Sequence, residues 1–215
     1  MSYGTIPKQA TLQVKPYEIK VSDEELQHFK QLLTLSRLAP LTYENNQTDP
    51  NKFGVTREWM SSTKKYWEND YDWRKREDIF NSFPNFKTTI KDEETNFTFD
   101  IHFVGLFSEK ADAIPITFLH GWPGSHLEFL GLLEVLKKQY NPADLPYHLI
   151  VPSLPGWTLS NGPPSDRNFV TEDIARVINK LMVGLFGDTQ YIAQGGDIGS
   201  YVCRVLHTYP TVSLE

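Results

Sequence analysis

The sequence predicts an α/β fold, in which a mostly parallel sheet carries helices on both of its faces. Residues 86–91 and 97–106 alternate apolar and polar side chains around a polar turn, which is typical of a β-hairpin. Strand patterns then alternate with helix patterns from residue 114 onward. Glycine-rich turns follow two of these strands, where open α/β sheets place their functional sites. We therefore expect the strand ends of this sheet to carry the site.

Residues 1–85 predict a helical segment that wraps the remainder of the chain. After an extended stretch over residues 15–20, the letters SDEE at residues 22–25 form a capping box that opens a first helix. Thr56 and Asp72 can cap a second and a third helix. These two helices carry a stripe of apolar and aromatic side chains, namely Trp59, Met60, Tyr66, Trp67, Trp73, Ile79 and Phe80. We expect this stripe to belong to the hydrophobic core rather than to a ligand site.

Residues 86–215 predict the sheet and its helices in chain order. The hairpin is followed by a continuous apolar run over residues 114–119, which is typical of a buried strand. Further strands are expected at residues 147–151 and 189–194, and helices at residues 127–138, 171–185 and 198–208, the last one ending before Pro210. The sequence thus divides into a helical region, residues 1–85, and an α/β region, residues 86–215.

Composition bounds the class of partner and the cellular location. Of the 215 residues 40% are hydrophobic and 13% aromatic, which is ample for a globular core. A net charge of −6 without basic runs argues against nucleic acid or an anionic membrane as the main partner. The single cysteine, Cys203, excludes an internal disulfide and a thiolate metal cluster, and it fits a reducing compartment. No stretch resembles a signal peptide or a membrane span, so we expect a cytoplasmic protein. From the charge we expect a small neutral partner, and we expect no cofactor and no metal.

The segment YIAQGGDIGS at residues 191–200 predicts a strand that turns sharply into a helix. Serine hydrolases place G-x-S-x-G at such an elbow, where glycine gives the room that a strained turn needs. Here Asp197 takes the position of the serine. A carboxylate is already ionised at neutral pH, so it needs no base to act as a nucleophile, and it points to alkyl transfer. The alternative is an ordinary turn in which Asp197 caps the helix.

A second motif, HGWPGS at residues 120–125, follows the predicted strand at residues 114–119. In α/β-hydrolase folds an oxyanion hole combines the amide after the nucleophile with an amide from a loop at this place. The amides of Ile198 and Trp122 fit these two roles. Taken alone, the motif is more typical of a structural turn, in which His120 bonds the backbone rather than ligating or shuttling protons. The two glycine turns occurring together, in this order, favour a site.

These motifs together resemble the amino-terminal part of an epoxide hydrolase of the α/β-hydrolase fold, in the microsomal and fungal branch with an extra N-terminal segment. The resemblance rests on residues 71–75, 81–86, 120–125, 153–156 and 193–199. It implies that Asp197 attacks an epoxide carbon and forms a covalent alkyl-enzyme ester. It also implies that the amides of Trp122 and Ile198 stabilise the oxyanion formed when water hydrolyses that ester.

The resemblance further implies a pocket for a small hydrophobic epoxide, bordered by Trp122, Pro123, Trp157 and Ile198. For the Trp122 and Trp157 side chains, plain burial against neighbours is the alternative. Ile198 stands where the family often has Trp, and the letters WTL at residues 157–159 replace an aromatic-glycine-aromatic run. Both departures concern the shape of the substrate and leave the backbone chemistry unchanged.

The family pattern continues with a further strand, a helical cap with two tyrosines, an acidic residue and a late histidine, whereas this sequence reaches Glu215 before them. We therefore expect a truncated chain that is inactive or impaired, with the strand before Asp197 as an exposed edge prone to self-association. His207 is too far along its helix to reach Asp197. His126 and His148 are expected to be structural or solvated, whereas His28 and His102 belong to elements remote in the chain and have no companion motif.

Two other functions remain open on the sequence. The chain could be a non-catalytic remnant that acts as an interaction module. It could also be a haloalkane dehalogenase, because those enzymes share the aspartate elbow and the oxyanion turn. Dehalogenases lack the N-terminal helical segment, so residues 22–86 discriminate between these two classes of enzyme.

Overall fold

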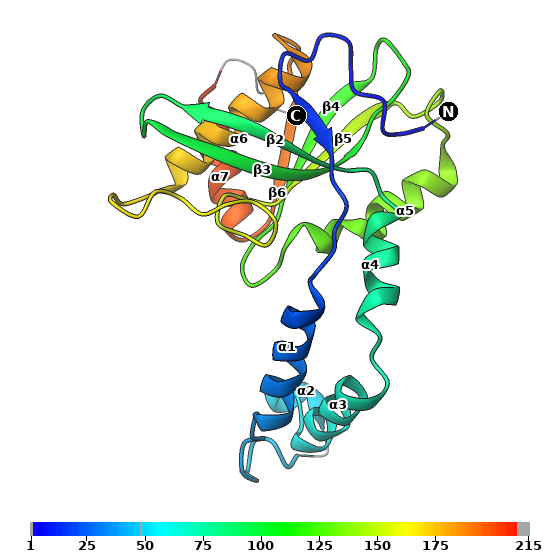
Figure 1. The fold of residues 1–215 in the computed structure, drawn as a ribbon, viewed down its shortest axis with the longest axis vertical. Coiled ribbons are helices and arrows are strands. Elements are labelled where there is room, and N and C mark those ends of the chain that lie inside the picture. The colour runs from blue at the N-terminus through cyan, green and yellow to red at the C-terminus, as the bar shows by residue number, and fades with distance from the viewer. Residues whose placement is uncertain (1, 48, 210–215) are drawn as a thin grey trace. The chain divides into compact units, whose positions relative to one another are not determined.

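The structure is a computed structural model, and it describes residues 2–47 and 49–209. Within these residues the chain divides into two compact units (Figure 1). The smaller unit comprises residues 19–79, and the larger unit combines the residues before 19 with those from 80 onward. The division predicted at residue 85 stays a prediction.

The larger unit contains a six-stranded sheet with the order β1-β2-β3-β5-β4-β6 (Figure 1). Its strands are β1 (Val14–Pro16), β2 (Asn85–Asp92), β3 (Phe97–Leu106), β4 (Ile114–Leu119), β5 (Tyr147–Pro152) and β6 (Ile192–Gly195). Strands β1, β2, β3 and β5 pair antiparallel in that order, whereas β4 pairs parallel with both β5 and β6. The predicted hairpin and the parallel strands after it are therefore confirmed. Strand β6 lies at the edge of the sheet in the described part of the chain.

Register brings the two glycine turns of the sequence to the same end of the sheet. Leu119, the last residue of β4, lies opposite Gly195, the last residue of β6. Because the two strands run parallel, the loops that leave them start side by side. The positions of β4 and β6 therefore already place the loop at residues 120–125 next to the elbow at Asp197.

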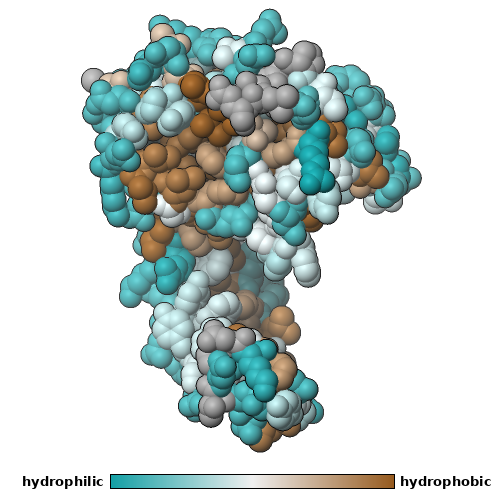
Figure 2. All heavy atoms as spheres, turned by 180° about the vertical axis from the view of Figure 1, so that it is seen from behind, coloured by the Kyte–Doolittle hydropathy of each residue, from teal (hydrophilic) through white to brown (hydrophobic). Residues whose placement is uncertain are grey.

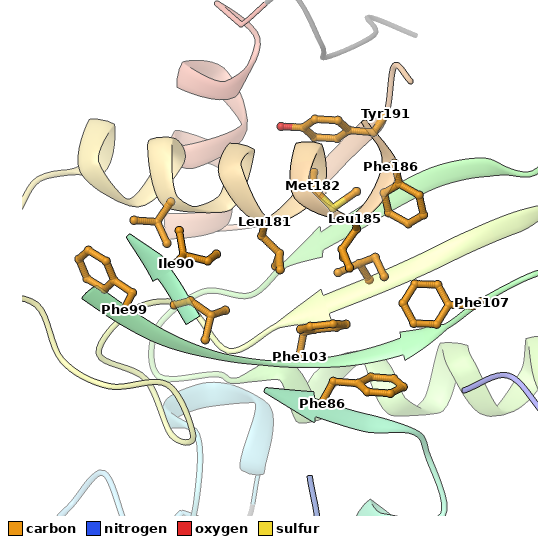
Figure 3. Close-up of a cluster of buried hydrophobic side chains, with 13 residues drawn as sticks. Phe86, Ile90, Phe99, Phe103, Phe107, Leu181, Met182, Leu185, Phe186 and Tyr191 are labelled. Carbon is orange, nitrogen blue, oxygen red and sulfur yellow. The ribbon is translucent and has the colours of Figure 1, made fainter. Parts of the chain in front are cut away.

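Helices cover both faces of this sheet, as the sequence predicts. They are η1 (His126–Phe129), α5 (Leu130–Gln139), α6 (Thr171–Phe186) and α7 (Ile198–Leu206). Alternation along β5 divides its side chains between the faces, since Ile150 packs with α6 while Leu149 and Val151 pack with α5. Figure 3 shows the α6 side, where aromatic and aliphatic side chains from β2, β3 and α6 interdigitate. Helix α7 ends two residues earlier than predicted, and Pro210 lies outside the described residues.

The smaller unit is helical, with α1 (Asp23–Leu35), α2 (Pro50–Phe53), α3 (Arg57–Asn69) and the start of α4 (Trp73–Asn81). The predicted caps are confirmed: Ser22 and Glu25 form a capping box, and the Thr56 hydroxyl accepts from the Trp59 N–H. Lys75 N–H donates to Asp72 at 3.3 Å, as expected for a cap of α4. No helix in the described residues combines the length and the apolar character that crossing a membrane requires.

The expectation that the aromatic stripe of these helices is core was wrong for α3, whereas Phe80 at the end of α4 does pack against a buried cluster. Trp59, Tyr66 and Trp67 are 53%, 47% and 41% exposed, and neither α1 nor α3 contains a buried residue. A unit as small as residues 19–79 has too little chain to cover the apolar faces of its own short helices. Its aromatic rings stack on one another at the surface instead, as Trp67 and Tyr71 do at 5.3 Å.

Candidate active site

The elbow after β6 holds Asp197 in a strained backbone conformation. Its φ of 51° and ψ of −124° lie in a region that residues with a side chain rarely occupy. Asp197 stands at the N-cap position of α7, but its side chain makes no capping hydrogen bond there. The alternative of an ordinary capping aspartate therefore does not describe this turn, because the carboxylate points elsewhere.

Two glycines allow the elbow to lie directly against the loop that follows β4. A Cβ atom on Gly199 would lie 2.1 Å from the Leu119 carbonyl oxygen, and one on Gly121 would lie 2.5 Å from the Asp197 Cβ. Both distances are far below van der Waals contact, so a side chain at either position would push the two loops apart. Gly121 and Gly199 therefore have the same effect, because the missing side chains allow Asp197 to lie against the backbone of residues 120–122.

The Asp197 carboxylate is exposed and receives a backbone hydrogen bond. The Trp122 N–H donates to its Oδ1 at 2.9 Å. This bond, together with the nearby Ile198 N–H, lowers the pKa of the Asp197 carboxyl, because both N–H groups favour its charged form. Only the Trp122 N–H reaches hydrogen-bond geometry, and among the described residues no group bonds to Oδ2. The carboxylate is thus ionised at neutral pH, with one oxygen held and the other free.

His120 lies behind this contact and is fully buried. Its Nε2 accepts from the Leu154 N–H at 3.1 Å, and its Nδ1 lies 3.2 Å from the Gly121 carbonyl oxygen. The prediction that His120 bonds the backbone is confirmed. The half-buried ring of Trp157 meets the His120 ring edge-on, with centroids 5.9 Å apart.

The four residues predicted to border a substrate pocket lie around the elbow with different exposures. Trp122 is 69% exposed, Pro123 is also exposed, and Trp157 and Ile198 are half-buried against a cluster that includes Leu154. Two hollows of about 680 and 1120 Å³ are both lined by residues of the smaller unit and do not include Asp197. The pocket role of these four residues stays a prediction.

Sequence reasoning missed a buried polar cluster formed by Ser153, His102, His126 and Thr158. Ser153 Oγ lies 2.9 Å from His102 Nδ1, 3.1 Å from His126 Nδ1 and 3.0 Å from Thr158 Oγ1. His102 Nε2 also contacts Asn85 Oδ1 at 3.0 Å. The signal available in the sequence was a histidine inside the apolar run of β3, together with Ser153 in a loop that the family resemblance includes. The expectation that His126 is structural is confirmed by its burial, and His102 is buried beside it.

Other histidines and acidic groups take no part in the site. His28 and His207 are exposed, and His148 accepts from the Ser108 N–H at the opposite end of β5. Over residues 2–47 and 49–209, no three His, Cys, Asp or Glu side chains are grouped so that they could hold a metal ion.

Comparison with known proteins decides the family. The family described as "Epoxide hydrolase N terminus" matches residues 14–129, and the family described as "alpha/beta hydrolase fold" matches residues 114–210. The chain belongs to the epoxide hydrolase family. The family resemblance and the fold class predicted from the sequence are thereby confirmed.

Solved and curated epoxide hydrolases resemble the chain over most of its length. The Aspergillus niger epoxide hydrolase shares 43% sequence identity at a TM-score of 0.88, covering 100% of this chain and 55% of that one. The juvenile hormone epoxide hydrolase of the silkworm Bombyx mori shares 28% identity at a TM-score of 0.74, covering 94% and 51%. Epoxide hydrolase 1 of Oryctolagus cuniculus is 32% identical, covering 88% of this chain and 41% of the relative.

The chain spans about half the length of the curated relatives that it matches. The matched part is 48% of a relative from Dothistroma septosporum that is 41% identical to this chain. The segment that discriminates epoxide hydrolases from dehalogenases, residues 22–86, falls inside the matched N-terminal family region.

Proposed function

We propose that this chain is the part of an epoxide hydrolase that contains the nucleophile, and that Asp197 is the residue that opens the epoxide. One observation supports this most: the Trp122 N–H holds Oδ1 of Asp197 at 2.9 Å, while Oδ2 has no hydrogen bond within the described residues. A carboxylate with one oxygen fixed and the other free is oriented to attack with the free one.

In the first step, Oδ2 attacks a carbon of the epoxide, and the bond between that carbon and the ring oxygen breaks. The electron pair of the broken bond stays on the ring oxygen, which takes a proton from water at this exposed site. The product is an ester between the Asp197 carboxyl and a β-hydroxyalkyl group. The lowered pKa of Asp197 keeps the carboxylate charged and ready for this step at neutral pH.

In the second step, water attacks Cγ of the ester, and negative charge develops on Oδ1. That oxygen is the one that the Trp122 N–H already contacts, and the Ile198 N–H lies close to the same carboxylate. Removal of a single donor of this kind from an oxyanion hole typically costs about 3 kcal/mol of transition-state stabilisation. Collapse of the intermediate breaks the bond between Cγ and the alkyl oxygen. One proton of the attacking water passes to that oxygen and completes the diol, and the other neutralises the hydroxide left by the first step, so that the carboxylate is restored.

The described residues supply the nucleophile and the amides but no base for the water. His120 belongs to the loop that contacts Asp197, but both of its ring nitrogens contact backbone atoms. No imidazole, His120 included, hydrogen-bonds to Asp197 in the part of the chain that the structure describes. We infer that the chain by itself accumulates the ester and releases diol slowly.

The substrate that fits is a small hydrophobic epoxide in contact with Trp122, Pro123, Trp157 and Ile198. A cytoplasmic location and self-association through β6 stay predictions. For the latter, support comes from the position of β6 at the edge of the sheet in the described residues. Figure 2 shows a continuous area of hydrophobic side chains on one face of the larger unit.

The test is to incubate the chain with a simple aryl epoxide, and separately with a haloalkane, and to record intact mass, diol and halide. A mass gain of one epoxide molecule per chain, absent in Asp197→Asn and present in Asp188→Asn, supports the proposal. Asp188 is an exposed aspartate of the same unit and serves as the matched control. Halide release without any epoxide adduct would indicate a dehalogenase, and the absence of every product would favour a non-catalytic remnant.

A further inference from the structure

A continuous set of hydrogen bonds links the loop after β5 to the Asp197 carboxylate. The Leu154 N–H donates to His120 Nε2 at 3.1 Å, and His120 Nδ1 lies 3.2 Å from the Gly121 carbonyl oxygen. The Trp122 N–H then donates to Asp197 Oδ1 at 2.9 Å. The buried imidazole therefore stands between one loop and the backbone of another.

The last two contacts of this set belong to one rigid group. The Gly121 C=O and the Trp122 N–H are the two polar ends of a single peptide unit, which is planar and trans. They therefore point in opposite directions from the same plane. His120 Nδ1 contacts the C=O end of this peptide unit, and Asp197 Oδ1 accepts from its N–H end.

The two backbone partners determine where the proton of His120 lies. The Leu154 N–H can only donate, so Nε2 must present its lone pair. The Gly121 carbonyl can only accept, so Nδ1 must carry the hydrogen. The ring is thus neutral with the proton on Nδ1, and burial favours the neutral state by lowering the pKa of His120.

Gly121 explains why the peptide needs such a support. Glycine is required there because a Cβ would lie 2.5 Å from the Asp197 Cβ. Glycine also leaves the backbone on either side free to rotate, so residue 121 does not itself fix the direction of the Trp122 N–H.

We propose that His120 is a positioning residue, which aims the Trp122 N–H at Asp197 by holding the Gly121 carbonyl. Its consequence for ester hydrolysis rests on the proposed function, whereas the geometric role does not. Through the Leu154 N–H, the loop that carries Trp157 then shares in setting the direction of an oxyanion-hole donor. A polar chain of this kind also polarises each of its members in turn.

The first test needs no substitution. Long-range proton–nitrogen correlation spectra of the uniformly ¹⁵N-labelled chain at neutral pH report which nitrogen of each imidazole carries hydrogen. We expect His120 to be neutral, with hydrogen on Nδ1 and a lone pair on Nε2. A His120 ring with its hydrogen on Nε2, or with hydrogen on both nitrogens, would overturn the proposal.

The second test separates the two ring nitrogens by substitution. An asparagine amide can replace Nδ1, and a glutamine amide can replace Nε2, so His120→Asn keeps the Gly121 contact and His120→Gln keeps the Leu154 contact. The readout is the pKa of the Asp197 carboxyl, followed through the pH dependence of the Trp122 amide resonance. His148→Gln is the matched control, since His148 is also buried and also accepts one backbone N–H, at the far end of β5.

We expect His120→Gln to raise the pKa of Asp197 toward its ordinary value, because the carboxylate loses a donor to its charged form. His120→Asn should keep the lowered pKa of Asp197. His148→Gln should lower the stability of the chain and leave the pKa of Asp197 unchanged. An unchanged pKa in His120→Gln, or the same rise in both His120 variants, would contradict the proposal. No epoxide is used, so a failure here leaves the adduct test intact, and a missing adduct leaves this result intact.

Discussion

At the scale of single residues, burial keeps several histidines of the larger unit neutral. Desolvation lowers the pKa of His102 to about 2, and the pKa values of His126 and His148 to about 4. In the unfolded chain the same groups titrate near 6.5. Between these values the unfolded state binds protons that the folded state does not, so stability falls as pH falls below about 6.5.

His148 allows this linkage to be measured without touching the site. For one such histidine the free energy of unfolding should drop by about 1.4 kcal/mol per pH unit between pH about 6.5 and the folded pKa. In His148→Asn the amide oxygen can still accept from the Ser108 N–H, but the titration is removed. We expect urea unfolding from pH 7 to 5 to show a shallower loss of stability in the variant. Parallel curves for the variant and the parent would contradict a neutral His148.

At the scale of elements, an ion network ties the β2–β3 turn to α6. Asp92, at the end of β2, is fully buried and accepts from Arg176 Nε at 2.7 Å and from Lys180 Nζ at 3.2 Å. Arg176 also donates to Asp173 at 2.6 Å. The hydrogen bonds from Arg176 hold the pKa of the Asp92 carboxyl well below its usual range. This contribution to stability is present above the ordinary aspartate pKa and is lost as pH falls through the folded value.

Asp92→Asn should therefore destabilise the larger unit by about 3 kcal/mol, because it leaves part of the charge on Arg176 and Lys180 buried without its partner. The comparison is Asp100→Asn, whose pair with Lys87 has a 48% exposed carboxylate side chain. An exposed pair of that kind contributes about 1 kcal/mol or less. Urea unfolding at neutral pH measures the free energy of unfolding of both variants. Equal losses would show that the buried network contributes no more to stability than the exposed pair does.

At the scale of the whole molecule, β6 is the last strand of the sheet formed by residues 2–47 and 49–209, and within that part of the chain no strand pairs with its outer side. Gln194 is exposed on this strand, and a lysine there would place a charge on the edge. We expect sedimentation velocity to show association that grows with concentration in the parent chain and is weaker in Gln194→Lys. Gln139→Lys, which adds the same charge on the exposed end of α5, should associate as the parent does. Association that is unaffected by Gln194→Lys would place the contact elsewhere.

Much of this molecule could be predicted from the sequence, for reasons that differ by element. Apolar runs and alternation locate β2 to β5 within one or two residues, because burial on a sheet leaves a direct signal in residue order. The contact between Trp122 and Asp197 follows from two glycine turns after neighbouring parallel strands.

The rest depends on contacts between distant segments, which no local pattern encodes. Ser153 joins His102 and His126 from three separate elements, and each residue alone looks unremarkable in the sequence. The direction of the Gly121–Trp122 peptide is likewise set by Leu154, a residue of another loop. The exposed aromatic rings of the smaller unit were misjudged because helical spacing shows which face is apolar but not what covers it.

The most direct test of Asp197 as the nucleophile is to locate the adduct after reaction with an aryl epoxide. Peptide fragmentation by mass spectrometry should place one hydroxyalkyl group on Asp197, as an ester that mild base removes and that Asp197→Asn does not form. An adduct on any other residue, or a modification at Asp197 that resists mild base, would contradict the account.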